Sequence, residues 1–139
     1  ELARLRQPVL AICLGLQLLY EHSEEDDTPC LGVFAGTVNR IVAAPGRPVP
    51  HMGWNTCRTL RPDSLLAGIT ATDYFYFVHS YAAPVGPHTT AATEYGGELS
   101  AVVRRNNFCG VQFHPERSGP AGARLLRNFL AQDAADSLH

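Results

Sequence analysis

The sequence predicts an α/β fold in which a strand-turn-helix unit is followed by antiparallel strands and a closing helix. Residues 9–13 form a short, wholly apolar and partly β-branched run, which is typical of a buried parallel strand. Residues 74–79 are rich in aromatic side chains, which favour strands. Residues 119–132 carry apolar side chains at helical spacing. We therefore expect a mixed sheet with flanking helices and no internal repeats.

The predicted strand-turn-helix unit begins the chain. Residues 1–6 are typical of the end of a helix, which Pro8 terminates. Gly15, just after the first strand, marks a tight turn. Residues 16–20 then predict a helix that ends in the acidic run of residues 24–27. Strand, turn and helix therefore meet where the first apolar run ends.

The middle of the chain predicts loops and two further strands. Residues 28–41 combine glycines with alternating apolar side chains, which indicates a loop and a strand. A proline-rich connection follows at residues 45–50. Residues 62–68 predict a helical turn or loop before the aromatic strand of residues 74–79.

The C-terminal part predicts antiparallel strands and the closing helix. Residues 89–95 and 100–105 are expected to be strands, and Asn106-Asn107 is expected to be a hairpin turn. The turn leads into a strand at residues 109–114, which ends on a histidine. The amphipathic helix of residues 119–132 completes the fold.

Size and charge narrow the classes of function. The 139 residues are 45% hydrophobic, which suits one compact domain or part of one. The formal net charge is −2 and no basic stripe is present, so neither nucleic acid nor an anionic membrane is an expected partner. The apolar run of residues 9–14 is too short to span a membrane, and no signal peptide is recognisable. We expect a soluble protein of the cytoplasm.

The four cysteines predict free thiols. They lie at Cys13, Cys30, Cys57 and Cys109, without a CxxC pair or a nearby histidine at zinc-ligand spacing. Neither a metal site nor a disulfide framework is expected.

Cys13 is the candidate nucleophile. It ends the first apolar strand and precedes Gly15 and a helix, which is the layout of a nucleophile elbow. The N-terminus of a helix favours a thiolate at this point. The alternative is that Cys13 is a small buried core residue, as most free cysteines are.

The segment Gln112-Phe113-His114-Pro115-Glu116 supplies a candidate base and carboxylate. Pro115 restricts the backbone, so that His114 and Glu116 can point toward one place. In a thiol triad the imidazole takes the proton of the cysteine, and the carboxylate orients the ring. The alternative reading of His114 alone is an exposed turn histidine.

These two segments resemble the class I glutamine amidotransferases. The resemblance rests on Ala11-Ile12-Cys13-Leu14-Gly15-Leu16-Gln17-Leu18-Leu19 and Gly110-Val111-Gln112-Phe113-His114-Pro115-Glu116. It implies a flavodoxin-like α/β fold and hydrolysis of L-glutamine to glutamate and ammonia, with catalytic residues Cys13, His114 and Glu116. It also implies that the side chain or backbone of Leu14, Gln17, Ser80 and Tyr81 holds the substrate. No metal or organic cofactor is implied.

Three further segments are similar to the glutaminase subunits of imidazole glycerol phosphate synthases. They are residues 49–55, 76–81 and 116–129. This similarity implies a heterodimer with a (β/α)8-barrel cyclase subunit, which receives the ammonia in histidine biosynthesis. The loop formed by His51, Met52, Gly53, Trp54 and Asn55 is expected near that interface, although Trp54 could equally be a core residue.

Two departures from the family pattern bear on activity. Ala11 stands where the family usually has glycine, and we expect the turn to tolerate the alanine with some backbone strain. The chain opens at Glu1 without an initiator methionine, so we expect residues 1–139 to be the C-terminal two-thirds of one amidotransferase domain. Its N-terminal strands and helices, including an oxyanion-hole loop, would then be absent, and the chain alone would be weak or inactive. The alternatives are another triad glutaminase or a non-catalytic binding subunit.

Overall fold

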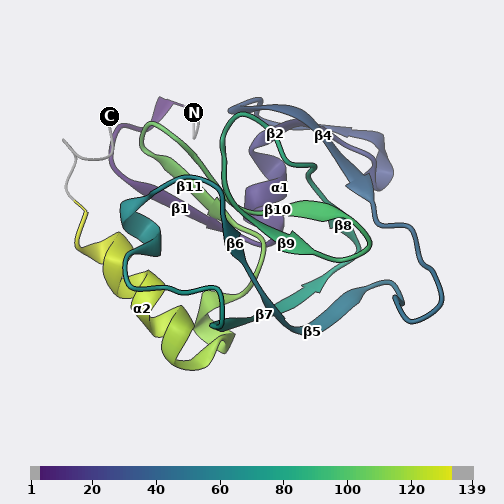
Figure 1. Ribbon diagram of the computed structural model, residues 1–139. Helices are drawn as coiled ribbons and strands as arrows, with labels where there is room; N and C mark the ends of the chain where they lie inside the picture. Colours follow the sequence, from purple (N-terminus) through teal and green to yellow (C-terminus); the bar gives the residue numbers. More distant parts are fainter. Residues whose placement is uncertain (1–3, 133–139) are drawn as a thin grey trace.

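The computed structural model describes residues 4–132 (Figure 1). The first half contains β1 (Val9–Ile12), α1 (Leu14–Leu18), β2 (Tyr20–Ser23), the 3₁₀ turn η2 (Glu25–Asp27), β3 (Thr28–Pro29), β4 (Phe34–Arg40), β5 (His51–Thr56), β6 (Arg58–Thr59) and the 3₁₀ turn η3 (Ser64–Leu66). The second half contains β7 (Tyr74–His79), β8 (Tyr81–Ala82), β9 (Thr89–Glu94), β10 (Glu98–Arg105), β11 (Phe108–Val111), the 3₁₀ turn η4 (Pro115–Arg117) and α2 (Gly119–Leu130).

A five-stranded mixed sheet forms the centre of the molecule, in the order β1-β11-β10-β9-β6. β1 runs parallel to β11, with Ala11 opposite Gly110. The other pairs of this sheet are antiparallel. A second sheet has the order β3-β2-β4-β8, and β5 pairs with β7 as a two-stranded ribbon. The predicted α/β fold with a mixed sheet is therefore confirmed.

The central sheet is covered on both faces. Side chains alternate along β1, so Leu10 and Ile12 pack into one apolar cluster, while Val9 and Ala11 pack into the other. The first cluster lies under α2, η3 and β7 and includes Leu125. The second cluster is formed with α1, β2 and β4 (Figure 1). This double coverage explains why residues 9–13 are apolar throughout.

Two predicted elements are wrong and one lies partly outside the described residues. The helix expected through residue 20 ends at Leu18, because Tyr20–Ser23 instead pairs with β4 as a parallel strand, and Tyr20 packs on Phe34. The expected loop at residues 51–55 is strand β5. Of the helix end expected at residues 1–6, residues 1–3 lie outside the described part of the chain, and residues 5 and 6 are irregular.

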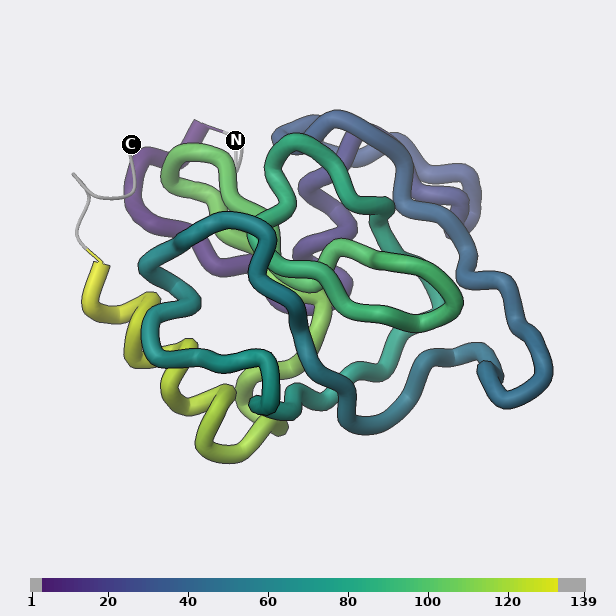
Figure 2. The backbone as a smooth tube through the Cα atoms, viewed as in Figure 1, coloured from purple at the N-terminus to yellow at the C-terminus, as the bar shows by residue number. Residues whose placement is uncertain are grey.

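The connection from β4 to β5 is a loop that projects from the body of the molecule, as Figure 2 shows in blue. It contains the proline-rich residues 45–50 that the sequence predicts to be a connection. Within residues 4–132, no helix is both long and apolar enough to cross a membrane. In the same residues, no group of three or more His, Cys, Asp or Glu side chains could hold a metal ion.

Candidate active site

Cys13 occupies a sharp turn between β1 and α1. Its φ of 53° and ψ of −108° lie in a region that side chains rarely adopt, and such strain is common at nucleophile elbows. The Cys13 N–H donates to the Val111 carbonyl at 2.8 Å, which ties the turn to the adjacent end of β11. Ala11 fits beside this turn, because even a Cβ added at Gly15 would lie 3.5 Å from its methyl group. The alanine is therefore accommodated without a close contact, and the strained backbone of the turn is at Cys13.

A pocket of about 410 Å³ opens beside Cys13. Its lining contains all four residues that the sequence predicts to hold the substrate, together with the candidate nucleophile. It is formed by Cys13, Leu14, Gln17, Glu25, Arg40, Val78, His79, Ser80 and Tyr81. The structure therefore brings together α1 and the β7–β8 turn, which are more than sixty positions apart in the sequence.

Gln17 joins these two segments by hydrogen bonds. It lies one helical turn beyond Cys13 and is only 5% exposed. Its Nε2 donates to the Tyr81 carbonyl at 2.8 Å and to Gln112 Oε1 at 3.1 Å. Because both hydrogens of the amide are used, the orientation of Gln17 is fixed.

Gln112 is a site residue to which the sequence analysis gave no role. It is fully buried, and its Nε2 donates to Cys13 Sγ at 3.7 Å. The thiol in turn faces the Val78 carbonyl at 3.8 Å. The sequence signal that could have identified Gln112 is its place between the apolar Val111 and Phe113, which are both buried, because a buried amide needs hydrogen-bond partners.

Burial dominates the acidity of Cys13. It raises the pKa of the thiol, and the charge of Glu116 raises this pKa further. The backbone N–H of Leu14 and the side chain of Gln112 oppose these effects. The Leu14 N–H at the N-terminus of α1 thus favours the thiolate, while burial of the sulfur disfavours it. A base must remove its proton when it reacts.

His114 and Glu116 form the predicted pair. His114 Nδ1 lies 2.8 Å from Glu116 Oε2, which leaves Nε2 free to accept a proton. The backbone N–H of His114 donates to the Tyr76 carbonyl at 2.9 Å, and Ser118 Oγ donates to the His114 carbonyl at 2.6 Å. These bonds attach the histidine to β7 and to the start of α2.

Gly122 allows α2 to pack closely on this segment. A Cβ at this position would lie 1.9 Å from the Pro115 carbonyl oxygen. The glycine in the C-terminal helix therefore has a packing role directly beside the histidine-glutamate pair.

The ends of β1 and β11 place Cys13 and His114 at the same edge of the central sheet. No hydrogen bond joins Cys13 Sγ to the His114 ring among the described residues. The charge of Glu116 nevertheless acts on the thiol, since it raises the pKa of Cys13. Contacts of this kind are often long before substrate binds.

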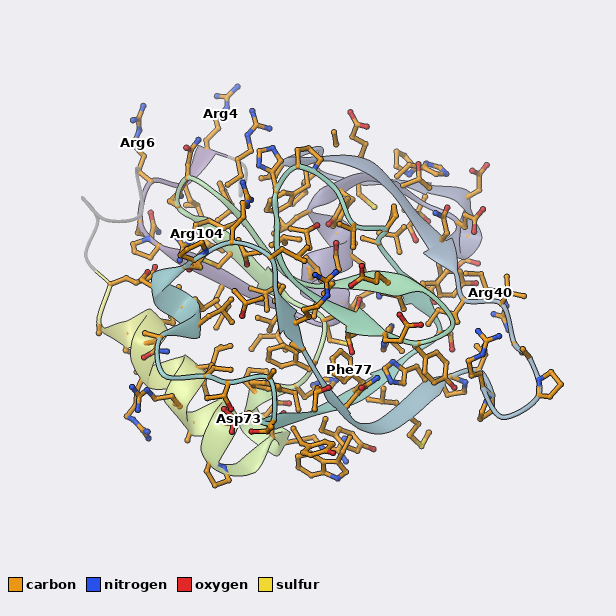
Figure 3. All side chains as sticks on the ribbon, in the orientation of Figure 1. Arg4, Arg6, Arg40, Asp73, Phe77 and Arg104 are labelled. Atoms are coloured by element: carbon orange, nitrogen blue, oxygen red, sulfur yellow. The ribbon has the colours of Figure 1, made fainter. Side chains whose placement is uncertain are left out.

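Glu25 and Arg40 are charged residues of the pocket that the sequence analysis did not select. Glu25 belongs to η2 and Arg40 ends β4, and both are exposed. Figure 3 labels Arg40 at the end of β4, where the strand leads into the projecting loop. One acidic and one basic side chain at a pocket mouth suit a zwitterionic amino acid. Their positions in the sequence, within an acidic run and at a strand end, gave no distinctive signal.

The five residues expected near a partner divide between the two faces of β5. Met52 and Trp54 are 63% and 56% exposed, whereas His51 is buried and Asn55 is half-buried. The Trp54 ring packs edge-on to Tyr76 at 5.7 Å, and Arg117 lies over Tyr76 at 4.4 Å. Trp54 is therefore a surface residue and not a core residue.

Comparison with known proteins agrees with this geometry. The family described as glutamine amidotransferase class-I matches residues 1–132. The curated protein "Imidazole glycerol phosphate synthase subunit HisH" of Xylella fastidiosa (strain Temecula1 / ATCC 700964) is 54% identical over 134 residues, which are 96% of this chain and 67% of the relative. The protein of the same name from Xanthomonas campestris pv. campestris (strain 8004) is 54% identical over 129 residues, which are 93% of this chain and 64% of the relative. The chain thus spans about two thirds of the length of these relatives.

Two solved structures share the fold. A structure described as a GMP synthase component from Thermoplasma acidophilum has a TM-score of 0.67 and 16% identity, over 98% of this chain and 60% of that chain. A structure described as a glutamine amidotransferase has a TM-score of 0.60 and 24% identity, over 88% of this chain and 59% of that chain. Together with the sequence matches, they lead to one conclusion: the chain belongs to the class I glutamine amidotransferase family, within the group of HisH subunits.

Proposed function

We propose that this chain carries a glutaminase site that hydrolyses L-glutamine to glutamate and ammonia. The observation that carries the proposal is the pocket in which Cys13, at a strained elbow, meets Gln17, Ser80 and Tyr81. The pocket has the volume of a small-molecule site. Membership of the class I amidotransferases supports the same reaction.

In the proposed reaction, Cys13 Sγ attacks the carbonyl carbon of the glutamine side chain. His114 Nε2 accepts the thiol proton and passes it to the departing ammonia, while Glu116 stabilises the charged ring. The backbone N–H of Leu14, which already stabilises negative charge on the sulfur, is a donor for the oxyanion. Water then hydrolyses the glutamyl thioester and regenerates the thiol.

Substrate recognition is proposed to combine hydrogen bonds with charge. Leu14, Gln17, Ser80 and Tyr81 surround the glutamine, mainly through the backbone and the amide oxygen of Gln17, since both of its amide hydrogens are already used. Of the pocket's charged side chains, Glu25 would attract the α-ammonium group and Arg40 the α-carboxylate.

The proposed acceptor of the ammonia is the cyclase subunit of imidazole glycerol phosphate synthase, in histidine biosynthesis, as the name of the HisH relatives suggests. The outward face of β5, with Met52 and Trp54, is the proposed contact in this heterodimer, because exposed aromatic and methionine side chains favour interfaces. The proposed location is the cytoplasm, where the four cysteines, which are free, would stay reduced.

The test is intact-mass labelling by a glutamine-like diazoketone, together with glutamate release with and without the cyclase subunit. We expect one adduct per chain, loss of the adduct in Cys13→Ala, and glutamine turnover that increases with the partner. If the longest natural chain that contains these residues folds but gains no adduct and releases no glutamate with the cyclase subunit present, the proposal is contradicted.

A further inference from the structure

Two buried histidines form a direct hydrogen bond behind the pocket. His51 Nδ1 lies 2.9 Å from His79 Nε2, and both residues are buried. His51 belongs to β5, whereas His79 ends β7 and lines the pocket. His51 itself does not line the pocket.

The hydrogen-bond partners define the tautomer of both rings. His79 Nδ1 lies 2.9 Å from the Tyr81 carbonyl, which can only accept, so Nδ1 carries the hydrogen and Nε2 is an acceptor. His51 must then donate from Nδ1, and its Nε2 faces the Asn55 amide at 3.4 Å. Burial lowers the pKa of both histidines, which keeps them neutral, as this arrangement requires.

The same carbonyl connects the histidines to the nucleophile. The Tyr81 oxygen accepts from His79 and also from Gln17 Nε2 at 2.8 Å. Gln17 then donates to Gln112, and Gln112 donates to Cys13 Sγ. A continuous chain of hydrogen bonds therefore runs from β5 to the sulfur.

The ring of His51 is held between two aromatic rings. It stacks on Tyr95 at 4.0 Å and on Phe77 at 4.9 Å, with interplanar angles of 19° and 20°. Figure 3 labels Phe77 in the region where the β5–β7 ribbon meets the core. This stack fixes the ring plane and leaves the direction of Nδ1 little freedom.

We infer that His51 is a positioning residue for the glutamine pocket, acting through His79 and the Tyr81 carbonyl. The inference rests on the proposed glutaminase function. His51 and Asn55 face inward from the strand whose other face carries Met52 and Trp54. A contact that shifts β5 would therefore change the position of the Tyr81 carbonyl and of Gln17.

The experiment compares two substitutions of His51 in the longest natural chain that contains these residues. His51→Phe keeps an aromatic ring between Tyr95 and Phe77 but removes the donor to His79. His51→Asn keeps a donor near the place of Nδ1 but removes the stacked ring. His88→Phe is the matched control, because the His88 ring also packs on an aromatic ring, edge-on to Phe34, and lies outside the glutamine pocket. The measurements are KM and kcat for glutamine, the rate of Cys13 alkylation by the diazoketone, and the thermal unfolding midpoint.

We expect His51→Phe to raise KM and slow alkylation by roughly fivefold to tenfold, as loss of one buried hydrogen bond predicts. The KM of His51→Asn should stay within about twofold of the wild-type value although the stacked ring is lost, since the asparagine donor restores the hydrogen bond to His79. A purely structural role would change the unfolding midpoint of both variants and the KM of neither, and that result would overturn the inference. Equal impairment of both variants in KM would also overturn it. A wild-type chain without turnover or adduct would instead contradict the proposed function itself.

Discussion

Gln17 Nε2 donates to the Tyr81 carbonyl at 2.8 Å, across 64 positions of sequence. This bond closes one side of the pocket, because it links α1 to the β7–β8 turn. The carbonyl receives a second donor from His79, so both of its lone pairs are used. The pocket is therefore shaped by buried amide and imidazole groups rather than by its exposed charges.

Replacing Gln17 should affect binding and stability together. Gln17→Met keeps the volume but leaves the Gln112 Oε1 without its donor, so we expect the free energy of unfolding to fall by about 1–3 kcal/mol. KM for glutamine should rise by roughly tenfold, since the Tyr81 turn loses one attachment. Urea unfolding and steady-state kinetics measure the two effects. Unchanged values in both would show that the amide has no positioning role.

At position 13, glycine should give a more stable fold than alanine, although both substitutions abolish activity. The φ of 53° is favourable for glycine, so Cys13→Gly should be more stable than Cys13→Ala by about 0.5–1 kcal/mol. Both variants should be inactive. Denaturant unfolding of the two proteins gives the difference directly, and an equally stable pair would argue against strain at the elbow.

Replacing Glu116 should slow catalysis but make the Cys13 thiol more acidic. Its charge raises the pKa of Cys13, so Glu116→Gln should move the pH dependence of Cys13 alkylation by iodoacetamide to lower pH. The same substitution should lower kcat by roughly tenfold to a hundredfold, because the His114 imidazolium loses its carboxylate. Peptide-level mass spectrometry separates Cys13 from the other thiols. A shift to higher pH would show that the charge of Glu116 does not raise the pKa of Cys13.

His51 makes stability depend on pH in a defined window. Burial, and then the neighbouring His79, lower the pKa of His51 from 6.5 to about 4. Between these values the unfolded chain binds a proton that the folded chain does not, so this contribution is fully present above pH 6.5 and is lost as the pH falls toward 4.

Between pH 7 and pH 4.5, the free energy of unfolding of the wild type should therefore fall by about 1–3 kcal/mol more than that of His51→Phe. Urea unfolding at the two pH values measures this difference. Parallel losses in the two proteins would mean that His51 titrates normally in the fold.

A buried ion pair far from the pocket should contribute to stability alone. Arg104 contacts Asp63 through Nε at 2.7 Å and Nη2 at 2.9 Å, and the Asp63 side chain is 2% exposed. Asp63→Ala should lower the free energy of unfolding by about 3–5 kcal/mol, because the partly buried Arg104 loses its partner and the Leu65 N–H loses its acceptor. Glu98→Ala, which removes an exposed pair with Arg58, is the control and should leave the free energy of unfolding almost unchanged. Similar losses in both variants would contradict the role of burial.

Much of the chemistry was predictable because it depends on short segments with strict local requirements. A buried strand, a tight turn and a helix after it define an elbow, so Cys13 could be selected from residues 9–20. The sequence His114-Pro115-Glu116 likewise places a base beside a carboxylate. The strands predicted at residues 74–79, 89–95 and 100–105 correspond to β7, β9 and β10, since their composition and turns agree with their tertiary role.

The sequence by itself determined the class of fold, and it predicted the candidate nucleophile and its histidine-glutamate pair, because periodicity and local motifs encode them. Only the tertiary structure decided that Tyr20–Ser23 is a strand, since four mostly polar residues are too few to show a helix or strand period and the pairing with β4 selects the strand. It also decided that Gln112, Glu25 and Arg40 belong to the site and that His51 bonds to His79. These contacts join residues far apart in sequence, so their geometry exists only after the sheet and its covering layers have packed.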